Sequence, residues 1–71
     1  MSTQKPFQLR GEYITLGQLL KAIGAVDRGS DVKELLYDFE FFVNGEPENR
    51  RGRKLRAGDV VSTPDGEFKI E

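Results

Sequence analysis

The sequence predicts a small α+β domain in which two short helices pack on a small, mostly antiparallel sheet. Three observations support this prediction: two segments carry apolar residues at helical spacing, the spacing changes to alternation near Phe39, and tight-turn signals recur after that point. The chain has 71 residues, which is the size of one domain. We therefore expect residues 1–71 to form a single domain.

The N-terminal part is predicted to contain one or two short strands followed directly by a helix. Residues 6–16 show short apolar alternation, and Gly11 is a natural bend. Thr15 and Gln18 then form a capping-box pair, which marks a helix start. The apolar face of this helix consists of Leu16, Leu19, Leu20 and Ile23. Gly24 is well suited to end the helix in a left-handed conformation.

A second helix is predicted to begin at Ser30 or Asp31, since either side chain can act as the N-cap. If Asp31 is the cap, Glu34 is placed to reach back to it. The apolar face, at i, i+3, i+4 and i+7, consists of Val32, Leu35, Leu36 and Phe39. About six residues join the two helices, so we expect an antiparallel or angled helix pair.

Beyond the second helix the pattern predicts short antiparallel strands connected by turns. Asn44-Gly45 should form a tight hairpin turn, because both residues tolerate a positive φ. Pro47 cannot donate a ladder hydrogen bond and therefore indicates an edge strand. A turn is expected at residues 57–59, before a strand through residues 60–61. Asp65-Gly66 is expected to form the last hairpin turn.

The most unusual feature is a basic segment in a chain whose net charge is −1. Its basic residues are Arg50, Arg51, Arg53, Lys54 and Arg56. Gly52 lets this segment bend, and Leu55 is expected to anchor it to the core. Arginine forks match phosphate oxygens in geometry and charge, which favours nucleic-acid binding. The alternative is a solvated loop whose charge is offset by nearby carboxylates. These carboxylates are Glu46, Glu48 and Asp59.

A second basic cluster surrounds the predicted start of the second helix. It comprises Arg28, Ser30 and Lys33, at a place where unpaired backbone N–H groups favour an anion. Lys21, on the polar side of the first helix, is expected to join them. The alternative is that Ser30 is only a cap and Lys33 is only solvated. The aromatic residues expected in the core, rather than stacked on bases, are Phe39, Phe41 and Phe68. The pattern does not place Phe42.

Composition excludes several classes of chemistry. The chain has no Cys and no His, so it cannot form disulfides, Cys/His zinc sites or a triad with His as the base. Its glycines match neither a phosphate loop nor a dinucleotide fingerprint. We therefore expect no enzymatic activity, no metal, no cofactor and no small-molecule substrate. Since the sequence shows no signal-peptide pattern and no apolar run long enough to span a membrane, we expect a cytoplasmic protein without a membrane partner.

Three segments resemble the S-four RNA-binding domain, a family named after a small-subunit ribosomal protein. They are ITLGQLLKAIGAV, DVKELL and FFVNGEPENRRGRKLRAGDVV. The resemblance covers residues 14–62. It is most specific at residues 43–45, in the basic run and at residues 58–60. More closely, the chain resembles the free-standing bacterial members of the family, the YaaA-like and YbcJ-like small proteins, and the stretch ENRRGRKL is similar to the YaaA-like group itself.

The resemblance implies a monomer that binds structured RNA, namely ribosomal RNA, a ribosome precursor or tRNA, as a ribosome assembly or translation-associated factor. It places the RNA-binding face on the helix pair and the adjoining strand-turn region. In this chain these positions are Arg28, Ser30, Lys33, Arg50, Arg51, Arg53 and Lys54. Such a face would hold RNA by its shape and phosphates.

Three positions depart from the family pattern. Arg28-Gly29 replaces a frequent Ser-Arg or Ser-Gly, and Val32 and Phe39 replace a usual Ala and Gly. The last two changes predict altered packing between the helices and the sheet. The alternative function is a protein-interaction module that keeps the fold but has lost RNA affinity.

Overall fold

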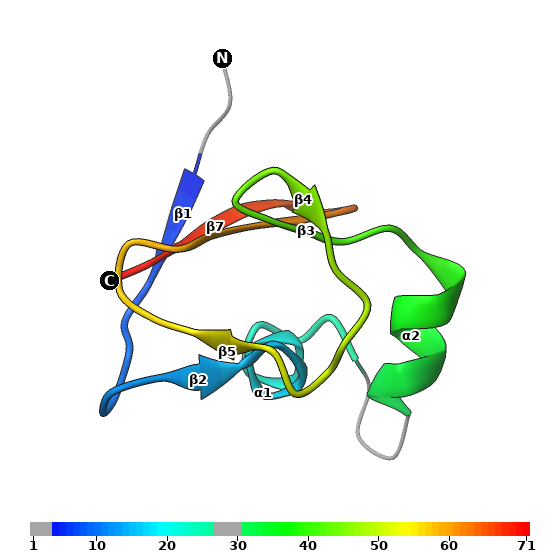
Figure 1. Cartoon of the computed structure of the whole chain (residues 1–71), viewed down its shortest axis with the longest axis horizontal. Coiled ribbons are helices and arrows are strands. Elements are labelled where there is room, and N and C mark those ends of the chain that lie inside the picture. Colours follow the sequence, from blue (N-terminus) through cyan, green and yellow to red (C-terminus); the bar gives the residue numbers. More distant parts are fainter. Residues whose placement is uncertain (1–3, 27–30) are drawn as a thin grey trace.

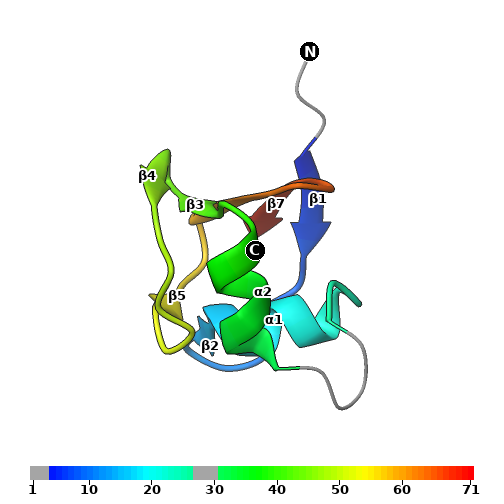
Figure 2. The same cartoon turned by 90° about the vertical axis from the view of Figure 1, so that its right-hand side faces the viewer.

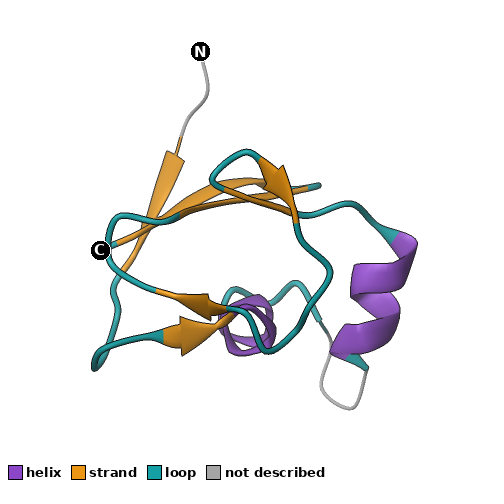
Figure 3. Ribbon diagram, viewed as in Figure 1, coloured by secondary structure: helices purple, strands orange, loops and turns teal. Residues whose placement is uncertain are grey.

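Two sheets and two helices make up the fold in the computed structural model, which describes residues 4–26 and 31–71. Figure 3 colours these elements by type. In chain order they are β1 (Gln4–Phe7), β2 (Ile14–Thr15), α1 (Leu16–Ala22), α2 (Val32–Asp38), β3 (Phe42–Val43), β4 (Glu46–Pro47), β5 (Lys54–Leu55), β6 (Val60–Thr63) and β7 (Gly66–Ile70).

The larger sheet has five strands in the order β1-β7-β6-β3-β4, and β2 and β5 form a separate antiparallel pair. All strand pairs are antiparallel except β1 and β7, which run parallel with Phe7 beside Ile70. In Figure 1 the five-stranded sheet lies above, α1 and the β2–β5 pair lie below, and α2 stands at one side. The predicted α+β class with a mostly antiparallel sheet is confirmed.

Helix α1 begins and ends where the sequence predicts. The Gln18 N–H donates to Thr15 Oγ1 at 3.3 Å, and the Thr15 N–H donates to Gln18 Oε1 at 3.1 Å, which completes the capping box. Ile23 is the C-cap, and Gly24 follows with a φ of 78°. These local hydrogen bonds define where α1 begins.

Helix α2 is capped by Asp31, whose Oδ1 accepts from the Lys33 N–H at 2.9 Å. Within the described residues Glu34 makes no return bond to this cap, so the predicted capping box does not form. Val32 and Leu36 are buried, as the helical spacing predicts. The alternative cap Ser30 lies outside the described residues.

The prediction that Phe39 faces the core is wrong. Phe39 is the C-cap of α2, its backbone is extended, and its side chain is 51% exposed. The residue has left the helical period, and the strand alternation begins only at β3. Phe41 is buried as predicted, while Phe42 is half-buried. Phe68 is also half-buried, with the Lys5 ammonium 5.8 Å from its ring centre.

The first hairpin turn forms as predicted, at Asn44-Gly45. These residues have φ values of 53° and 83°, the left-handed conformation that a two-residue hairpin requires. The Asn44 side chain also donates to Asp59 Oδ1 at 3.1 Å and accepts from the Val60 N–H at 2.9 Å. It thereby ties the hairpin to the turn that precedes β6. Strand β4 lies at the sheet edge, where Pro47 needs no N–H.

The last hairpin turn lies one residue earlier than predicted. Thr63 pairs with Gly66 across the β6–β7 ladder, so the two loop residues are Pro64 and Asp65. The Asp65 N–H donates to Thr63 Oγ1 at 3.1 Å, and that hydroxyl donates to the Gly66 carbonyl at 2.9 Å. The threonine hydroxyl therefore organises this turn.

The hydrophobic core lies between the two layers and receives side chains from both helices and both sheets. Its buried members are Leu16, Leu19, Leu20, Val32, Leu36, Phe41, Val43, Leu55, Val61 and Ile70. Leu55, in β5, is fully buried, so the predicted anchor of the basic segment is confirmed. The basic residues around it are consequently held at a fixed place on the fold.

Candidate nucleic-acid interface

Residues 50–56, here called the basic loop, are docked by their backbone on the N-terminus of α1. The Gly17 N–H donates to the Arg51 carbonyl at 2.9 Å, and the Leu16 N–H donates to the Arg53 carbonyl at 2.8 Å. These are the first N–H groups of the helix, which have no partner inside it. The loop carbonyls therefore satisfy the first N–H groups of α1, and the same hydrogen bonds hold the loop in position.

The close approach of the loop requires a glycine at position 17. A Cβ atom on Gly17 would lie 3.3 Å from the Arg51 carbonyl oxygen and 3.5 Å from Val32 Cγ1. The first distance is tighter than ordinary van der Waals contact. Gly17 is thus the point where α1, α2 and the basic loop meet. The sequence pattern marks it only as a glycine on a helix.

Replacing Gly17 with valine should displace the basic loop. Three added carbon atoms cannot fit beside the Arg51 carbonyl, and such overpacking costs about 1–3 kcal/mol of the free energy of unfolding. Urea unfolding measures this loss. The matched control is Ala22→Val, which places the same side chain on an exposed position of α1. An equal loss in both variants would show that valine disturbs only the helix.

A single carboxylate, Glu48, holds two of the loop arginines. It accepts from Arg50 Nε at 3.0 Å, from Arg50 Nη2 at 3.1 Å and from Arg53 Nη1 at 3.3 Å. The Arg50 backbone N–H adds a fourth bond at 3.2 Å. Chiefly through the side-chain bond to Arg50, and despite an opposing effect of burial, the pKa of Glu48 falls from an ordinary 4.5 to about 2. The carboxylate stays ionised at neutral pH.

Glu48→Gln should flatten the acid side of the stability profile. Because the pKa of Glu48 is lowered to about 2, the folded state holds this proton less tightly than the unfolded state. The stabilisation is complete above pH 4.5 and is lost as the pH falls toward 2. The free energy of unfolding, measured across this pH range, should therefore decrease less steeply with falling pH in the variant than in the wild type. Glu46→Gln, at an exposed site in β4, is the control and should keep the wild-type slope.

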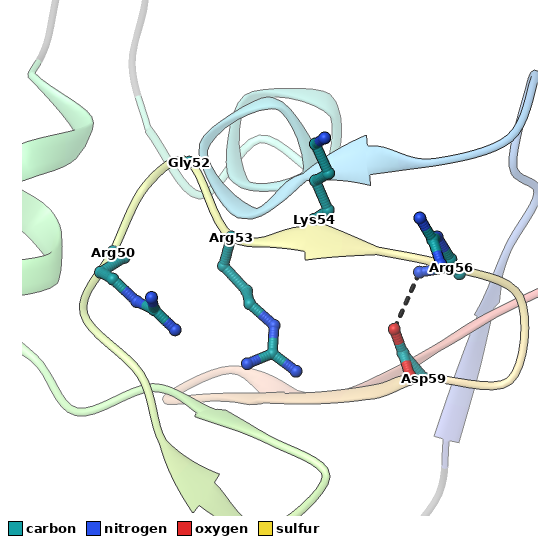
Figure 4. Close-up of a pocket in the computed structure, with 6 residues that line it drawn as sticks. All are labelled: Arg50, Gly52, Arg53, Lys54, Arg56 and Asp59. Atoms are coloured by element: carbon teal, nitrogen blue, oxygen red, sulfur yellow. Dashed lines mark hydrogen bonds between the residues drawn. The ribbon is translucent and has the colours of Figure 1, made fainter.

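Four of the five predicted basic residues of the loop line a shallow hollow, although they do not all point the same way, and Arg51 is not among them. The hollow is lined by Arg50, Gly52, Arg53, Lys54, Arg56 and Asp59. Figure 4 shows Arg50 and Arg53 extending together from one side of the loop, whereas Lys54 extends toward β2. Within the described residues no carboxylate pairs with the side chains of Arg51, Lys54 or Arg56. These three cations are available to an external anion.

Two further side chains shape this surface: Tyr13, which was not predicted, and Asp59, which was expected only as a nearby carboxylate. The Lys54 ammonium lies 4.9 Å from the centre of the Tyr13 ring, whose side chain is 44% exposed. Asp59 accepts from the Arg56 backbone N–H at 2.8 Å, a bond drawn in Figure 4, and so fixes the end of the loop. A tyrosine beside a lysine gives no sequence signal, because β2 and β5 are paired only in the folded chain.

The second predicted cluster is only partly placed. Lys33 is exposed in the first turn of α2 and lines a separate hollow with Glu34, Tyr37 and Asn49. Asn49 precedes the basic loop, so this hollow borders it. Lys21 is exposed in the last turn of α1 and lines neither hollow. Arg28 and Ser30 lie outside the described residues.

Other chemistry receives no support from the described part of the chain. Residues 4–26 and 31–71 contain no group of three or more acidic, His or Cys side chains arranged to hold a metal ion. Neither described helix has the length and apolar character that crossing a membrane requires. The basic loop and its surroundings are therefore the strongest candidate site.

Comparison with known proteins identifies the class to which this fold and site belong. The family model of the S4 domain matches residues 7–71, so the chain belongs to the S4 domain family. Among individual proteins, the chain is similar in sequence to the probable ribosome maturation protein RlbA of Bacillus subtilis (strain 168). The two are 46% identical over 66 residues, which cover 92% of this chain and 93% of that protein. The predicted family is confirmed, and the match extends beyond residues 14–62 in both directions.

Proposed function

We propose that this chain is a non-catalytic, monomeric, single-domain RNA-binding protein that acts in ribosome maturation. Its ligand is structured RNA: ribosomal RNA, a ribosome precursor or tRNA. The observation that carries the proposal is the basic loop, whose backbone is fixed on α1 while three of its cations have no carboxylate partner among residues 4–26 and 31–71. Membership of the S4 domain family supports it, and so does the likeness to the B. subtilis relative, a probable ribosome maturation protein.

The loop binds the RNA backbone rather than base edges. Arg51, Lys54 and Arg56 contact phosphates, and the docked backbone gives them a spacing that suits a folded RNA. Arg50 and Arg53 contribute less, because Glu48 already shares their charge. Lys33 and Lys21, with Arg28 and Ser30, extend the contact along the helices. With these four residues, the proposed contact includes all the RNA-binding candidates predicted from the sequence.

Binding to a structured RNA over a series of salt concentrations tests the proposal. Release of counterions makes log K fall with log salt by about 0.7 for each phosphate contacted on a single strand and by about 0.9 on a duplex. The three cations without a carboxylate partner among the described residues therefore predict a slope of about −2 to −3, and all five basic residues of the loop would give about −3.5 to −4.5. No binding at low salt, or an affinity independent of salt, would overturn the proposal.

Glu48→Gln has a second expected effect, on RNA affinity. The substitution removes the negative charge that pairs with Arg50 and Arg53, so both guanidinium groups become available to phosphate. The affinity should rise several-fold at neutral pH, and the two added phosphate contacts should make the salt slope steeper by about 1.4 to 1.8. The control is again Glu46→Gln. An unchanged slope would show that Arg50 and Arg53 do not reach the RNA.

The alternative function is a protein-interaction module with the same fold. It is favoured by the overall charge of −1 and by the neutralisation of two loop arginines. Pull-down from lysate with and without ribonuclease separates the two functions. Partners that survive nuclease treatment support the module, whereas partners lost with the RNA support the proposed function.

A further inference from the structure

A second charged region, opposite in sign to the basic loop, precedes it in the chain. Residues 34–49 contain five carboxylates and no Lys or Arg. Within them the stretch YDFEFF, residues 37–42, alternates aromatic and acidic side chains before ending in two phenylalanines. This composition is unsuited to RNA, because carboxylates repel phosphates. The proposed RNA-binding function therefore makes no use of it.

The structure places the alternating residues around one hollow at the C-terminal end of α2. We call it the acidic–aromatic surface, and its outer members are Tyr37, Asp38, Phe39, Glu40, Phe42 and Pro47. Tyr37 is 89% exposed and Phe39 is 51% exposed. Figure 2 shows this end of α2 leading into β3, beside the β3–β4 hairpin. Two large rings left in water at one hollow indicate a contact site.

The carboxylates on this surface are not balanced internally. Within the described residues neither Asp38 nor Glu40 takes part in an ion pair. Glu48, which also lines the hollow, is already bonded to Arg50 and Arg53. The surface therefore carries net negative charge next to exposed aromatic rings.

We propose that the acidic–aromatic surface docks an arginine-rich segment of another protein. A guanidinium group is planar, so it stacks on an aromatic face while its N–H groups pair with a carboxylate. The rings and carboxylates that line this one hollow supply both kinds of contact. The exposed part of the Phe39 ring offers apolar area to aliphatic side chains that flank the arginines of the docked segment. No residue of the basic loop lines this hollow, and Tyr37 is the member of the acidic–aromatic surface that also lines the hollow of Lys33.

Fluorescence anisotropy with a labelled peptide tests the proposal. The probe is a peptide of about ten residues in which arginine and leucine alternate. This length suits a short linear segment bound by a folded domain. The same peptide with lysine in place of arginine should bind several-fold more weakly, since ammonium groups do not stack as well. With glutamate in place of arginine it should not bind. Failure of the arginine peptide to bind the wild-type chain overturns the proposal.

Two double variants locate the contact. Asp38→Lys with Glu40→Lys should weaken peptide binding by at least about tenfold, because like charges then face each other. Tyr37→Ser with Phe39→Ser should have a similar effect through lost stacking. If the Tyr37/Phe39 double variant does not fold, the single variant Tyr37→Ser replaces it in this test, since the Tyr37 side chain is almost entirely exposed.

The matched control is Glu12→Lys with Glu71→Lys, which makes the same charge change at exposed sites elsewhere. It should alter peptide binding by no more than about twofold. Equal weakening by the control would show non-specific attraction and overturn the proposal. Self-association of the wild-type chain in sedimentation, abolished by the Asp38/Glu40 variant, would instead assign the surface to a second copy and also overturn it.

Discussion

Replacing Lys54 and Arg56 together with glutamate should weaken binding to a structured RNA by about 100-fold or more at low salt. The two side chains are cations of the basic loop that have no carboxylate partner within the described residues. Their reversal leaves Arg51 as the one unpaired cation of the described loop and adds two negative charges beside the phosphates. Filter binding or anisotropy with a labelled RNA hairpin measures the effect.

The fold should survive this double substitution, because both side chains are exposed and only the backbone N–H of Arg56 is bonded to Asp59. The melting temperature should change by only a few degrees, as is usual for surface changes. Lys5→Glu with Lys69→Glu makes the same charge change on β1 and β7 and is the control. A control that weakens RNA binding equally would contradict a localised site.

Arg50 is a less informative target for charge reversal. Its side chain is 71% exposed, yet it is bonded to a Glu48 side chain that is only 9% exposed. A glutamate at position 50 would face Glu48 and disturb the loop itself. Any loss of RNA affinity in such a variant would mix electrostatic and structural causes, which the Lys54 and Arg56 pair avoids.

Leu55→Ala should cost about 3 kcal/mol of the free energy of unfolding, within the range of 2–5 kcal/mol for buried leucines. Leu55 is fully buried and carries the basic loop into the core shared by α1, α2 and the five-stranded sheet. In a domain this small, such a loss lowers the melting temperature by more than about 10 °C. Urea unfolding and a thermal melt measure both quantities.

The control for this substitution is Leu35→Ala in α2. Leu35 is only half-buried and packs at the edge of the same core, so its truncation leaves a smaller cavity. The expected loss is about half that at Leu55. A loss below about 1 kcal/mol for Leu55→Ala would show that the basic loop is not anchored through this residue.

Features that depend on neighbouring residues were predictable from the sequence. The capping box of α1, the apolar spacing of both helices and the Asn44-Gly45 turn are each determined within a few residues. The grouping of Arg50, Arg53, Lys54 and Arg56 around one hollow also follows from their proximity in the chain. Leu55 was identifiable because apolar residues are scarce around it.

Features that depend on distant contacts were not predictable. The parallel pairing of β1 with β7 joins the two ends of the chain, and no local pattern encodes it. Phe39 was assigned to the core because its spacing suits both periods, but the chain changes conformation at that residue. The need for glycine at position 17 arises only when the Arg51 carbonyl is brought against α1.

The candidate site was predicted in composition and only partly in geometry. Glu48 was expected to offset the basic charge in a general way, whereas it binds two particular arginines and, in the part of the chain that the structure describes, the other basic side chains of the loop have no carboxylate partner. That division decides which side chains are proposed to contact RNA. Which arginines Glu48 reaches depends on the backbone conformation of residues 48–53, which the sequence does not define.

The most direct test of the proposed RNA contact is to map it by nuclear magnetic resonance, with a structured RNA hairpin added to the labelled chain. Amide shifts should change most in the basic loop and at Gly17, where the loop is hydrogen-bonded to α1. Smaller changes are expected at Lys33 and at Tyr37, which lines the same hollow, and residues 38–42 should not respond. Changes concentrated at residues 37–42, with residues 50–56 unaffected, would contradict the proposed function.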